Sequence, residues 1–406
     1  MFLMDVYVAR QPIFDCHKNV YAYELLFRDG TANFVPDIDG DVATNTVLAN
    51  SILTIGMDVI SGGKKSFVNF TRNLLVKKIP LLLPKENIVV EILEDVTAEA
   101  EVVLACREMA QKGFLIALDD FEYSDDLEPL IELADIIKFD FRMSSPEEIQ
   151  SYIDQLAGKN LRLLAEKVET QEEFKLALDM GFELFQGYFF CRPEIMQGKK
   201  IPSSQIAQLQ IIAEINQPDY DFNTLETLIS RDVGISYKLL RYINSPFFAK
   251  PNEISSIKQA LVYMGGDELR RFMSLMAITE LAEGKPHELI SLSCIRGKFC
   301  ELLGRESKYQ LKTSELFTVG MFSLIDVIVD QPMAKVMEKL PLSENLVTAL
   351  VRKKGKLAGF LALSIAYEQG RWSSIATIAE RLGIDEAVIP RLYAEACQWS
   401  NSVALG

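Results

Sequence analysis

The sequence has few residues of the kind that bind transition metals, because it contains only two histidines, His17 and His287, and no Cys-x-x-Cys pair. Catalytic or metal sites built from several histidines are therefore excluded. The six cysteines are scattered along the chain. This spacing favours buried reduced thiols over a disulfide framework, and it predicts a cytoplasmic location.

Basic charge and long apolar runs are also scarce. The formal net charge is -15, which argues against a broad surface for DNA or for anionic membranes and favours a concave anionic site that holds divalent cations. The longest apolar run, Leu316 to Val329, contains Asp326 and is too short to span a bilayer. The N-terminus reaches Asp5 without a basic region, so no signal peptide is expected.

The chain is long enough for two domains, which we place at residues 1–200 and 201–406. In the first, strand-like and helix-like segments alternate about seven times. One buried strand, expected at 114–118, stops at the adjacent acids Asp119 and Asp120. The alternation predicts an α/β fold, a TIM-like (β/α) barrel with its site at the C-terminal face. A doubly wound open sheet is the alternative, but its frequent glycine-rich phosphate loop is absent.

Oxygen-bearing side chains stand at or near the ends of the expected strands: Glu24, Asn69, Glu91, Asp119, Asp120 and Glu166. Singly, each is explained as a turn former, a helix cap or a surface acid. At successive strand ends they favour Mg²⁺ or Mn²⁺, which prefer oxygen ligands. Six such residues exceed the needs of one ion and predict two ions about 3.5–4 Å apart, an arrangement that suits phosphoester hydrolysis. Lys138 would then orient or activate the attacking water, and Arg28 would hold a substrate phosphate.

These residues resemble the EAL domain, the phosphodiesterase domain that opens the bacterial second messenger cyclic di-GMP to linear pGpG. The matching segments are Glu24-Leu25-Leu26-Phe27-Arg28 for Glu-Ala-Leu-Leu-Arg, Asn69, Glu91 with Glu94, Asp119-Asp120-Phe121 for Asp-Asp-Phe, Lys138, Ala165 to Thr170 for Ala-Glu-Gly-Val-Glu-Thr, and Gln186-Gly187. The resemblance implies that the metal ligands are Glu24, Asn69, Glu91, Asp119 and Asp120. It further implies that Lys138, Glu166 and Gln186 complete the catalytic site, that Arg28 contacts a phosphate, and that Glu94 and Glu169 support loops.

Three positions depart from the EAL pattern. Residues Glu122 to Asp125 replace a Gly-Thr-Gly loop that in the family tunes metal binding and dimer contacts, Lys167 replaces a glycine, and Leu25 replaces an alanine. None of the three removes a predicted ligand. The resemblance therefore implies an active enzyme that uses two divalent cations, Mg²⁺ or Mn²⁺, with a homodimer among its expected forms.

Residues 201–406 have a helical pattern throughout, and Leu316 to Val329 is expected to be the central helix because it is apolar nearly all round. Segments Lys238 to Pro246, Ile254 to Leu261 and Gly320 to Asp326 resemble the HDOD domain. That all-α domain is similar to metal-dependent HD phosphohydrolases but lacks their metal-binding His and Asp residues. The resemblance implies an unidentified protein partner, and it implies structural roles for Asn244, Ser245 and Asp326.

Ala379, Gly383 and Val388 have the spacing of a helix-turn-helix motif. The second helix would begin with Asp385 and Glu386, whose negative charge is wrong for a phosphate backbone. Core packing of a helix pair is therefore favoured, and no DNA binding is expected.

An EAL domain followed by an HDOD domain is similar to the EAL–HDOD (YuxH-type) family of bacterial signalling proteins. We therefore predict a metal-dependent cyclic di-GMP phosphodiesterase with an HDOD interaction domain. The alternative, motivated by the altered loop after Asp120, is a catalytically silent scaffold that binds protein partners and takes the nucleotide as a signal.

Overall fold

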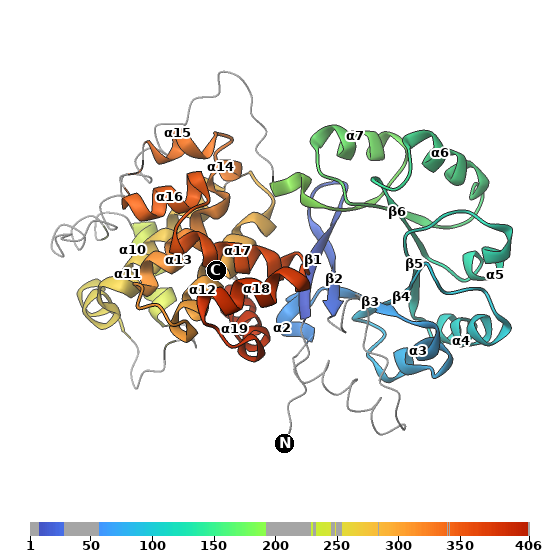
Figure 1. Ribbon diagram of the computed structural model, residues 1–406, viewed down its shortest axis with the longest axis horizontal. Coiled ribbons are helices and arrows are strands. Elements are labelled where there is room, and N and C mark those ends of the chain that lie inside the picture. Colours follow the sequence, from blue (N-terminus) through green and yellow to red (C-terminus); the bar gives the residue numbers. More distant parts are fainter. Residues whose placement is uncertain are drawn as a thin grey trace. The chain divides into compact units, whose positions relative to one another are not determined.

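The computed structural model describes residues 8–27, 57–191, 229, 233–244, 248, 254–282, 284–338, 340 and 342–404. The chain divides into two compact units, the first made of residues 1–192 and 367–373 and the second of residues 193–366 and 374–406. Within the described residues, the first unit contains a strand barrel and the second contains helices only (Figure 1). The two predicted fold classes are confirmed. The domain limits 1–200 and 201–406 stay a prediction, because residues 192–228 lie outside the described part of the chain.

Eight strands close into a barrel in chain order. They are β1 (Val8–Asp15), β2 (Val20–Phe27), β3 (Lys65–Phe70), β4 (Ile88–Ile92), β5 (Leu115–Leu118), β6 (Ile136–Asp140), β7 (Arg162–Glu166) and β8 (Leu184–Gln186). Strand β1 is antiparallel to both β2 and β8, and every other pair is parallel. Antiparallel neighbours need only a tight connection. Here the Asp15 carboxylate accepts hydrogen bonds from the backbone nitrogens of His17 and Asn19, at 2.9 and 2.8 Å. The closed barrel overturns the open-sheet alternative.

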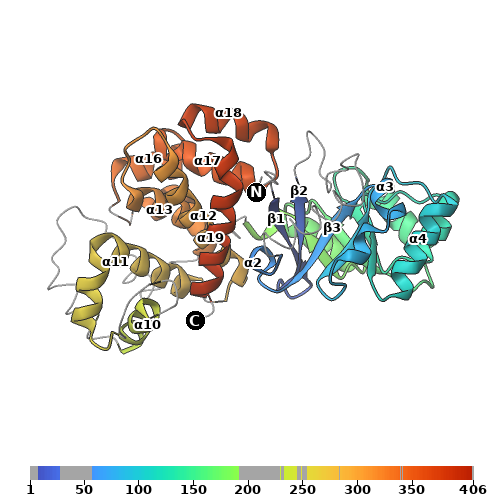
Figure 2. The same cartoon turned by 90° about the horizontal axis from the view of Figure 1, so that it is seen from below.

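Helices connect the parallel strands and lie outside the barrel (Figures 1 and 2). They are α2 (Met57–Ser61), α3 (Arg72–Val76), α4 (Ala100–Gln111), α5 (Glu128–Ile131), α6 (Pro146–Gln155) and α7 (Gln171–Asp179), with 3₁₀ turns η1 (Ile79–Leu82), η2 (Asp125–Leu127) and η3 (Tyr188–Cys191). Capping boxes start α6 at Ser145 and α7 at Thr170, each with a glutamate three residues later. These caps satisfy free backbone N–H groups at the helix starts and fix the loops that leave β6 and β7.

One layer of apolar side chains fills the barrel, and each strand contributes one residue. This apolar layer consists of Ile13, Ala22, Phe67, Val89, Ala117, Ile136, Leu164 and Leu184, all at most 1% exposed. Because successive side chains of a strand point to opposite faces, residues two positions away from this layer also point into the barrel. The apolar layer therefore sets the position of the next layer along the barrel axis.

The second unit is built around one buried helix. Its elements are α10 (Val233–Ile243), α11 (Ile257–Leu281), α12 (His287–Glu306), α13 (Thr313–Met321), η4 (Phe322–Leu324), α14 (Ile325–Ile328), α15 (Met333–Met337), α16 (Glu344–Arg352), α17 (Lys356–Glu368), α18 (Trp372–Leu382), η5 (Glu386–Val388) and α19 (Ile389–Ala404). Helix α12 is buried from Glu288 to Gly304 and packs against α13 and α19 (Figure 2). A Cβ at Gly320 would lie 2.2 Å from the carbonyl oxygen of Arg296, so glycine permits the close approach of α13 to α12.

The prediction that Leu316 to Val329 forms the central helix is wrong. Helix α13 ends at Met321, and the chain turns through η4 before the short α14 begins. An all-round apolar pattern reports burial and does not by itself report an unbroken helix. The central helix is α12. Its burial could not be recognised from the sequence, because the helix contains charged residues such as Glu301. The Glu301 carboxylate is fully buried and accepts a charged contact from Arg271 at 2.9 Å.

Two of the HDOD residues singled out in the sequence, Asn244 and Asp326, form hydrogen bonds, and the Asp326 carboxylate accepts one from the Val327 backbone nitrogen at 3.0 Å. The Asn244 amide donates to the Ile254 carbonyl at 2.8 Å, and its oxygen accepts from the Ile254 backbone nitrogen at 3.0 Å. Ser245 lies outside the described residues. His287 is exposed at the start of α12. Of the three residues with helix-turn-helix spacing, Ala379 is buried, Val388 is partly exposed and Gly383 is exposed. None of the described helices is long and apolar enough to cross a membrane.

The six cysteines form no disulfide with one another, and four are buried: Cys106, Cys294, Cys300 and Cys397. Burial raises the pKa of the Cys106, Cys294 and Cys300 thiols to about 12. Cys16 is exposed and Cys191 is partly exposed, so the expectation of uniformly buried thiols is wrong for these two.

Thiolate is the reactive form of cysteine. We therefore expect a disulfide reagent at pH 8 to react rapidly with Cys16, more slowly with Cys191, and with the buried thiols only after denaturation. Absorbance of the released chromophore measures this time course, and Cys16→Ser should remove the rapid phase. Rapid reaction of more than two thiols in the native protein would contradict the described burial.

Candidate active site at the C-terminal end of the barrel

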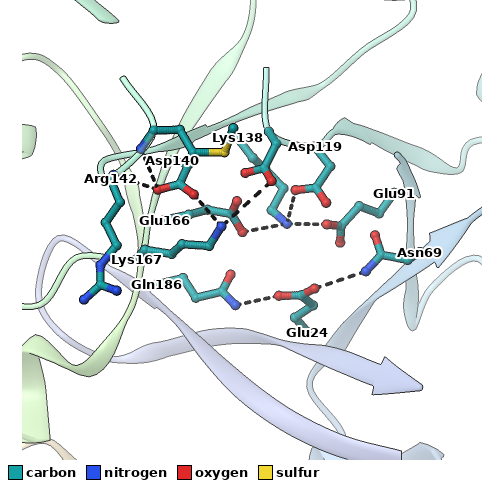
Figure 3. Close-up of polar contacts among 12 residues, drawn as sticks. Glu24, Asn69, Glu91, Asp119, Lys138, Asp140, Arg142, Glu166, Lys167 and Gln186 are labelled. Carbon is teal, nitrogen blue, oxygen red and sulfur yellow. Dashed lines mark hydrogen bonds and ion pairs between the residues drawn. The ribbon is translucent and has the colours of Figure 1, made fainter. Parts of the chain in front are cut away.

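A layer of polar side chains lies directly above the apolar layer, and each strand again contributes one residue. In β2 to β8 each member lies two positions after the apolar residue of its strand. In β1, which runs antiparallel to its neighbours, the member lies two positions before the apolar residue. This polar layer consists of Gln11, Glu24, Asn69, Glu91, Asp119, Lys138, Glu166 and Gln186. Figure 3 shows seven of these side chains turned toward one another. The barrel thus brings seven predicted site residues together, and among the members of the layer Gln11 alone was not predicted.

The Lys138 ammonium lies among three carboxylates (Figure 3). Its Nζ is 2.8 Å from Asp119 Oδ1 and 2.7 Å from Glu166 Oε1, and it also contacts Glu91 Oε1. The lysine side chain is 1% exposed. Burial alone would lower the pKa of Lys138, but the surrounding carboxylates, above all Asp119 and Glu166, raise it well above its ordinary value. Lys138 is therefore a charged hydrogen-bond donor.

One ammonium cannot neutralise this group of acids. Burial raises the pKa values of Glu91 and Glu166 well above their ordinary range, although the Lys138 charge opposes the effect. For Asp119 burial acts in the same direction, but the Lys138 charge outweighs it and the pKa falls below its ordinary value. The layer therefore carries excess negative charge, which a proton or a bound cation must compensate.

Amide side chains hold the Glu24 carboxylate from both sides. Asn69 Nδ2 donates to Glu24 Oε1 at 3.1 Å, and Gln186 Nε2 donates to Glu24 Oε2 at 2.6 Å (Figure 3). Gln186 Nε2 also lies 3.1 Å from Gln11 Oε1. Because both residues donate through nitrogen, their amide oxygens, Asn69 Oδ1 and Gln186 Oε1, make no hydrogen bond to Glu24. Gln11 belongs to this network and was missed in the sequence, where only the reversed direction of β1 could have revealed it.

The two adjacent aspartates stand where β5 ends. The Asp119 nitrogen donates to the Ile92 carbonyl of β4 at 2.9 Å, and the Phe121 nitrogen donates to the Lys138 carbonyl of β6 at 2.9 Å. Between these anchors Asp120 takes a positive φ of 37°. As a result, carboxylate oxygens of Asp119, Asp120 and Glu166 lie within 4.8 Å of one another.

The donor set fits hard divalent cations. Within the described part of the chain, four buried carboxylate or amide oxygens of the predicted site residues have no hydrogen-bond partner: Asn69 Oδ1, Glu91 Oε2, Asp120 Oδ1 and Gln186 Oε1. Unpaired buried oxygens are costly, and each needs a donor, a water or an ion. Mg²⁺ and Mn²⁺ take oxygen ligands of these types. The residues present therefore fit the predicted cations.

Two further charged residues, Lys167 and Asp140, lie next to this layer. Lys167 follows Glu166 and forms an ion pair with Asp140, while its Nζ is 3.9 Å from Asp120 Oδ2. Burial would lower the pKa of Lys167, but the hydrogen bond to Asp140 and the nearby carboxylates raise it. The sequence drew attention to Lys167 only as a replaced glycine. Its pairing with Asp140 depends on the closure of β6 against β7.

The remaining predicted residues lie outside the layer. Glu169 forms an ion pair with Arg142 of the loop after β6, and its backbone nitrogen donates to Glu173 at 2.6 Å. Glu94 is exposed in the loop after β4. Arg28, predicted to contact a phosphate, lies outside the described residues.

Gly187 fixes the position of Gln186. Its φ is 146°, and a Cβ at this residue would lie 2.0 Å from the Val168 carbonyl oxygen. The Val168 nitrogen donates to the Gln186 carbonyl at 3.0 Å, so β8 and the loop after β7 are in direct contact here. Only a residue without a side chain permits this contact.

We expect Gly187→Ala to destabilise the barrel by about 1–3 kcal/mol through backbone strain and the clash with Val168. Urea unfolding measures the change. Gly158→Ala is the matched control, because Gly158 also has a positive φ, of 86°, but an added Cβ there meets nothing within 4 Å. Equal losses in the two variants would contradict the role of the Val168 contact.

Comparisons with known proteins agree with this arrangement. A family model of the EAL domain matches residues 43–193, and one of the HDOD domain matches residues 201–364. The chain is 36% identical over 404 residues to "Cyclic di-GMP phosphodiesterase CdgJ" of Vibrio cholerae serotype O1, covering 99% of this chain and 94% of that protein. It is 34% identical over 408 residues to "Uncharacterized protein YuxH" of Bacillus subtilis, covering 98% and 99%.

Similarity to solved structures is lower. The EAL enzyme Bd1971, in its form with bound cAMP and cyclic di-GMP, matches with 18% identity and a TM-score of 0.38 over 47% of this chain. The match covers 62% of that chain, which is less than two thirds of its length. The two full-length relatives and the two domain matches decide the assignment: this chain belongs to the EAL–HDOD family, in which an EAL domain precedes an HDOD domain.

Proposed function

We propose that the protein is a metal-dependent phosphodiesterase that hydrolyses cyclic di-GMP to linear pGpG. The observation that carries the proposal is the polar layer, in which buried carboxylate and amide oxygens without partners surround a single ammonium. The relative CdgJ, similar over 99% of this chain, is named a cyclic di-GMP phosphodiesterase and supports the choice of substrate.

In this proposal Glu24, Asn69, Glu91, Asp119 and Asp120 hold two divalent cations, Mg²⁺ or Mn²⁺. When bound, such a pair stabilises the negative charge that develops on the attacking and leaving oxygens of a phosphodiester. The protein contributes preorganised geometry, because the amides of Asn69 and Gln186 already fix the Glu24 carboxylate.

The chain's own charged groups orient the reactants. Lys138, held as an ammonium by the three carboxylates that its N–H donors contact, orients or activates the attacking water through its positive charge. Glu166 and Gln186 complete the site around this water, and Arg28 holds a substrate phosphate. Because pGpG keeps its terminal phosphate on a 5′ oxygen, water forms the new P–O bond and the P–O3′ bond breaks. The loop-supporting roles fall to Glu94 and Glu169.

The test is product analysis by liquid chromatography. Purified protein is incubated with cyclic di-GMP and either MnCl₂ or MgCl₂, and a parallel sample contains EDTA. We expect pGpG with at least one metal and no product with EDTA. A folded protein that yields no pGpG with either metal would refute the proposal, and hydrolysis that persists in EDTA would refute the metal dependence.

For the helical unit we propose a protein-binding role, with a partner that is not yet identified. The support is the match of the HDOD family model to residues 201–364. A homodimer is a further proposed form, and sedimentation at several protein concentrations measures it.

A catalytically silent scaffold is the second candidate. The observation that favours it is the segment Glu122 to Asp125, which follows Asp119-Asp120-Phe121 in place of the family's Gly-Thr-Gly loop. Calorimetry that detects cyclic di-GMP binding, together with no pGpG in the product analysis, would favour the scaffold. Measurable turnover would reject it as the main role.

A further inference from the structure

Lys167 lies at the edge of the proposed cation site in an unusual backbone conformation. It directly follows Glu166 at the end of β7, and its φ is 55°, in the left-handed region that glycine adopts most easily. A lysine at this position is strained relative to glycine. The chain nevertheless places a cationic side chain there, and half of that side chain is exposed.

The ammonium of Lys167 faces two carboxylates of the site (Figure 3). It pairs with Asp140 Oδ2 and lies 3.9 Å from Asp120 Oδ2. Asp140 is itself held in place, because its Oδ1 accepts hydrogen bonds from the backbone nitrogens of Arg142 and Met143, at 2.7 and 3.4 Å. The positive charge is thus anchored beside Asp120, whose other oxygen, Oδ1, is buried and has no hydrogen-bond partner among the described residues.

We propose that Lys167 acts as an internal competitor for the divalent cation that Asp120 binds, and so makes one of the two cations bind more weakly than the other. This inference rests on the proposed function and concerns the same site. The ammonium supplies one positive charge where a dication would supply two. A cation that binds at Asp120 must therefore either accept the repulsion of Lys167 or displace its side chain toward solvent.

The expected size of the effect follows from charge and distance. Two groups of like charge a few ångströms apart near a protein surface repel strongly enough to change an affinity by about tenfold or more. Salt weakens this repulsion, because half of the Lys167 side chain is exposed to solvent. The competition is therefore expected to be largest at low ionic strength.

The experiment measures Mn²⁺ binding directly, without nucleotide and without turnover. Isothermal titration calorimetry with MnCl₂ is performed on the full-length wild type and on the variants K167M, K167R and K167G. K167M removes the charge but keeps a side chain on the left-handed residue, whereas K167R keeps the charge. K167G removes both charge and strain, so it remains informative if K167M folds poorly.

A matched control is K78M. Lys78 also has a positive φ, of 57°, and pairs with a carboxylate, that of Glu108 on α4. K78M therefore also removes an ion-paired lysine whose backbone is in the left-handed region, but at a position that is not part of the polar layer. We expect K78M and K167R to bind Mn²⁺ as the wild type does.

In the wild type we expect one tighter and one weaker Mn²⁺. K167M and K167G should tighten the weaker one by about tenfold at low salt, and by less at high salt. Unchanged Mn²⁺ affinity in both variants would overturn this inference, and the proposed function would still stand if the wild type hydrolyses cyclic di-GMP. If the wild type binds no Mn²⁺ and produces no pGpG, the inference and the proposed function fall together.

Discussion

Replacing Asp119 by asparagine is expected to lower the rate of cyclic di-GMP hydrolysis by about 100-fold or more, as the loss of one preorganised electrostatic group does in other enzymes. Asparagine has nearly the same shape as aspartate but removes the negative charge that Asp119 presents to Lys138 at 2.8 Å and to a cation. The measurement is the steady-state rate of pGpG formation at saturating MnCl₂, and circular dichroism follows folding.

The control for this variant is Asp125→Asn, the same substitution at an exposed acid of the following loop. We expect it to change the rate little, because the Asp125 side chain is exposed and is not among the predicted metal ligands. If Asp119→Asn retained the wild-type rate, Asp119 would be neither a metal ligand nor an electrostatic part of the site. If both variants lost activity equally, the loop rather than the carboxylate layer would be responsible.

Replacing Lys138 by methionine is expected to destabilise the metal-free barrel by about 3–5 kcal/mol, because removing one partner of a buried ion pair leaves uncompensated charge. The ammonium is buried and contacts Glu91, Asp119 and Glu166. Urea unfolding in EDTA measures the loss. MnCl₂ is expected to restore part of the stability, since a cation bound only by the folded state stabilises that state.

The loss in Lys138→Met is expected to depend on pH. Burial already raises the pKa values of Glu91 and Glu166, and without the lysine they rise further. A carboxyl group with a higher pKa in the folded than in the unfolded state favours folding below its unfolded pKa, and this contribution disappears as pH rises through the folded value. The variant should therefore be least stable at neutral and higher pH, and should recover as pH falls toward the ordinary carboxyl range.

Lys159→Met is the matched control for this prediction. Lys159 pairs with Glu128, but both side chains are partly exposed, so its loss should change stability little. A Lys138→Met variant as stable as this control in EDTA, at all pH values, would show that the carboxylates of the barrel do not depend on the buried ammonium.

The residues of the polar layer could be found from the sequence because strand periodicity and strand ends constrain them. Glu24, Asn69, Glu91 and Asp119 each stand two positions beyond an apolar residue of the layer below. In a closed barrel that spacing is enough to bring them together. Gln11 escaped notice because β1 runs in the opposite direction, so its residue at this level precedes the apolar Ile13 rather than following it.

Contacts that depend on tertiary geometry could not be predicted. The pairing of Lys167 with Asp140 joins two residues 27 positions apart, and it requires both the left-handed backbone and the register of β6 with β7. Local sequence signals are also ambiguous at helix ends. Thr97 has the side chain of a helix cap, yet α4 begins at Ala100 and the Thr97 hydroxyl instead donates to Glu99 at 3.2 Å. Such choices are decided by neighbouring side chains as well as by propensity.

Anomalous diffraction at the manganese absorption edge, from crystals grown with MnCl₂, tests the central claim most directly. The account predicts two manganese peaks in the polar layer, coordinated by oxygens of Glu24, Asn69, Glu91, Asp119 and Asp120. A polar layer without manganese at saturating concentration, or peaks confined to other parts of the protein, would contradict it.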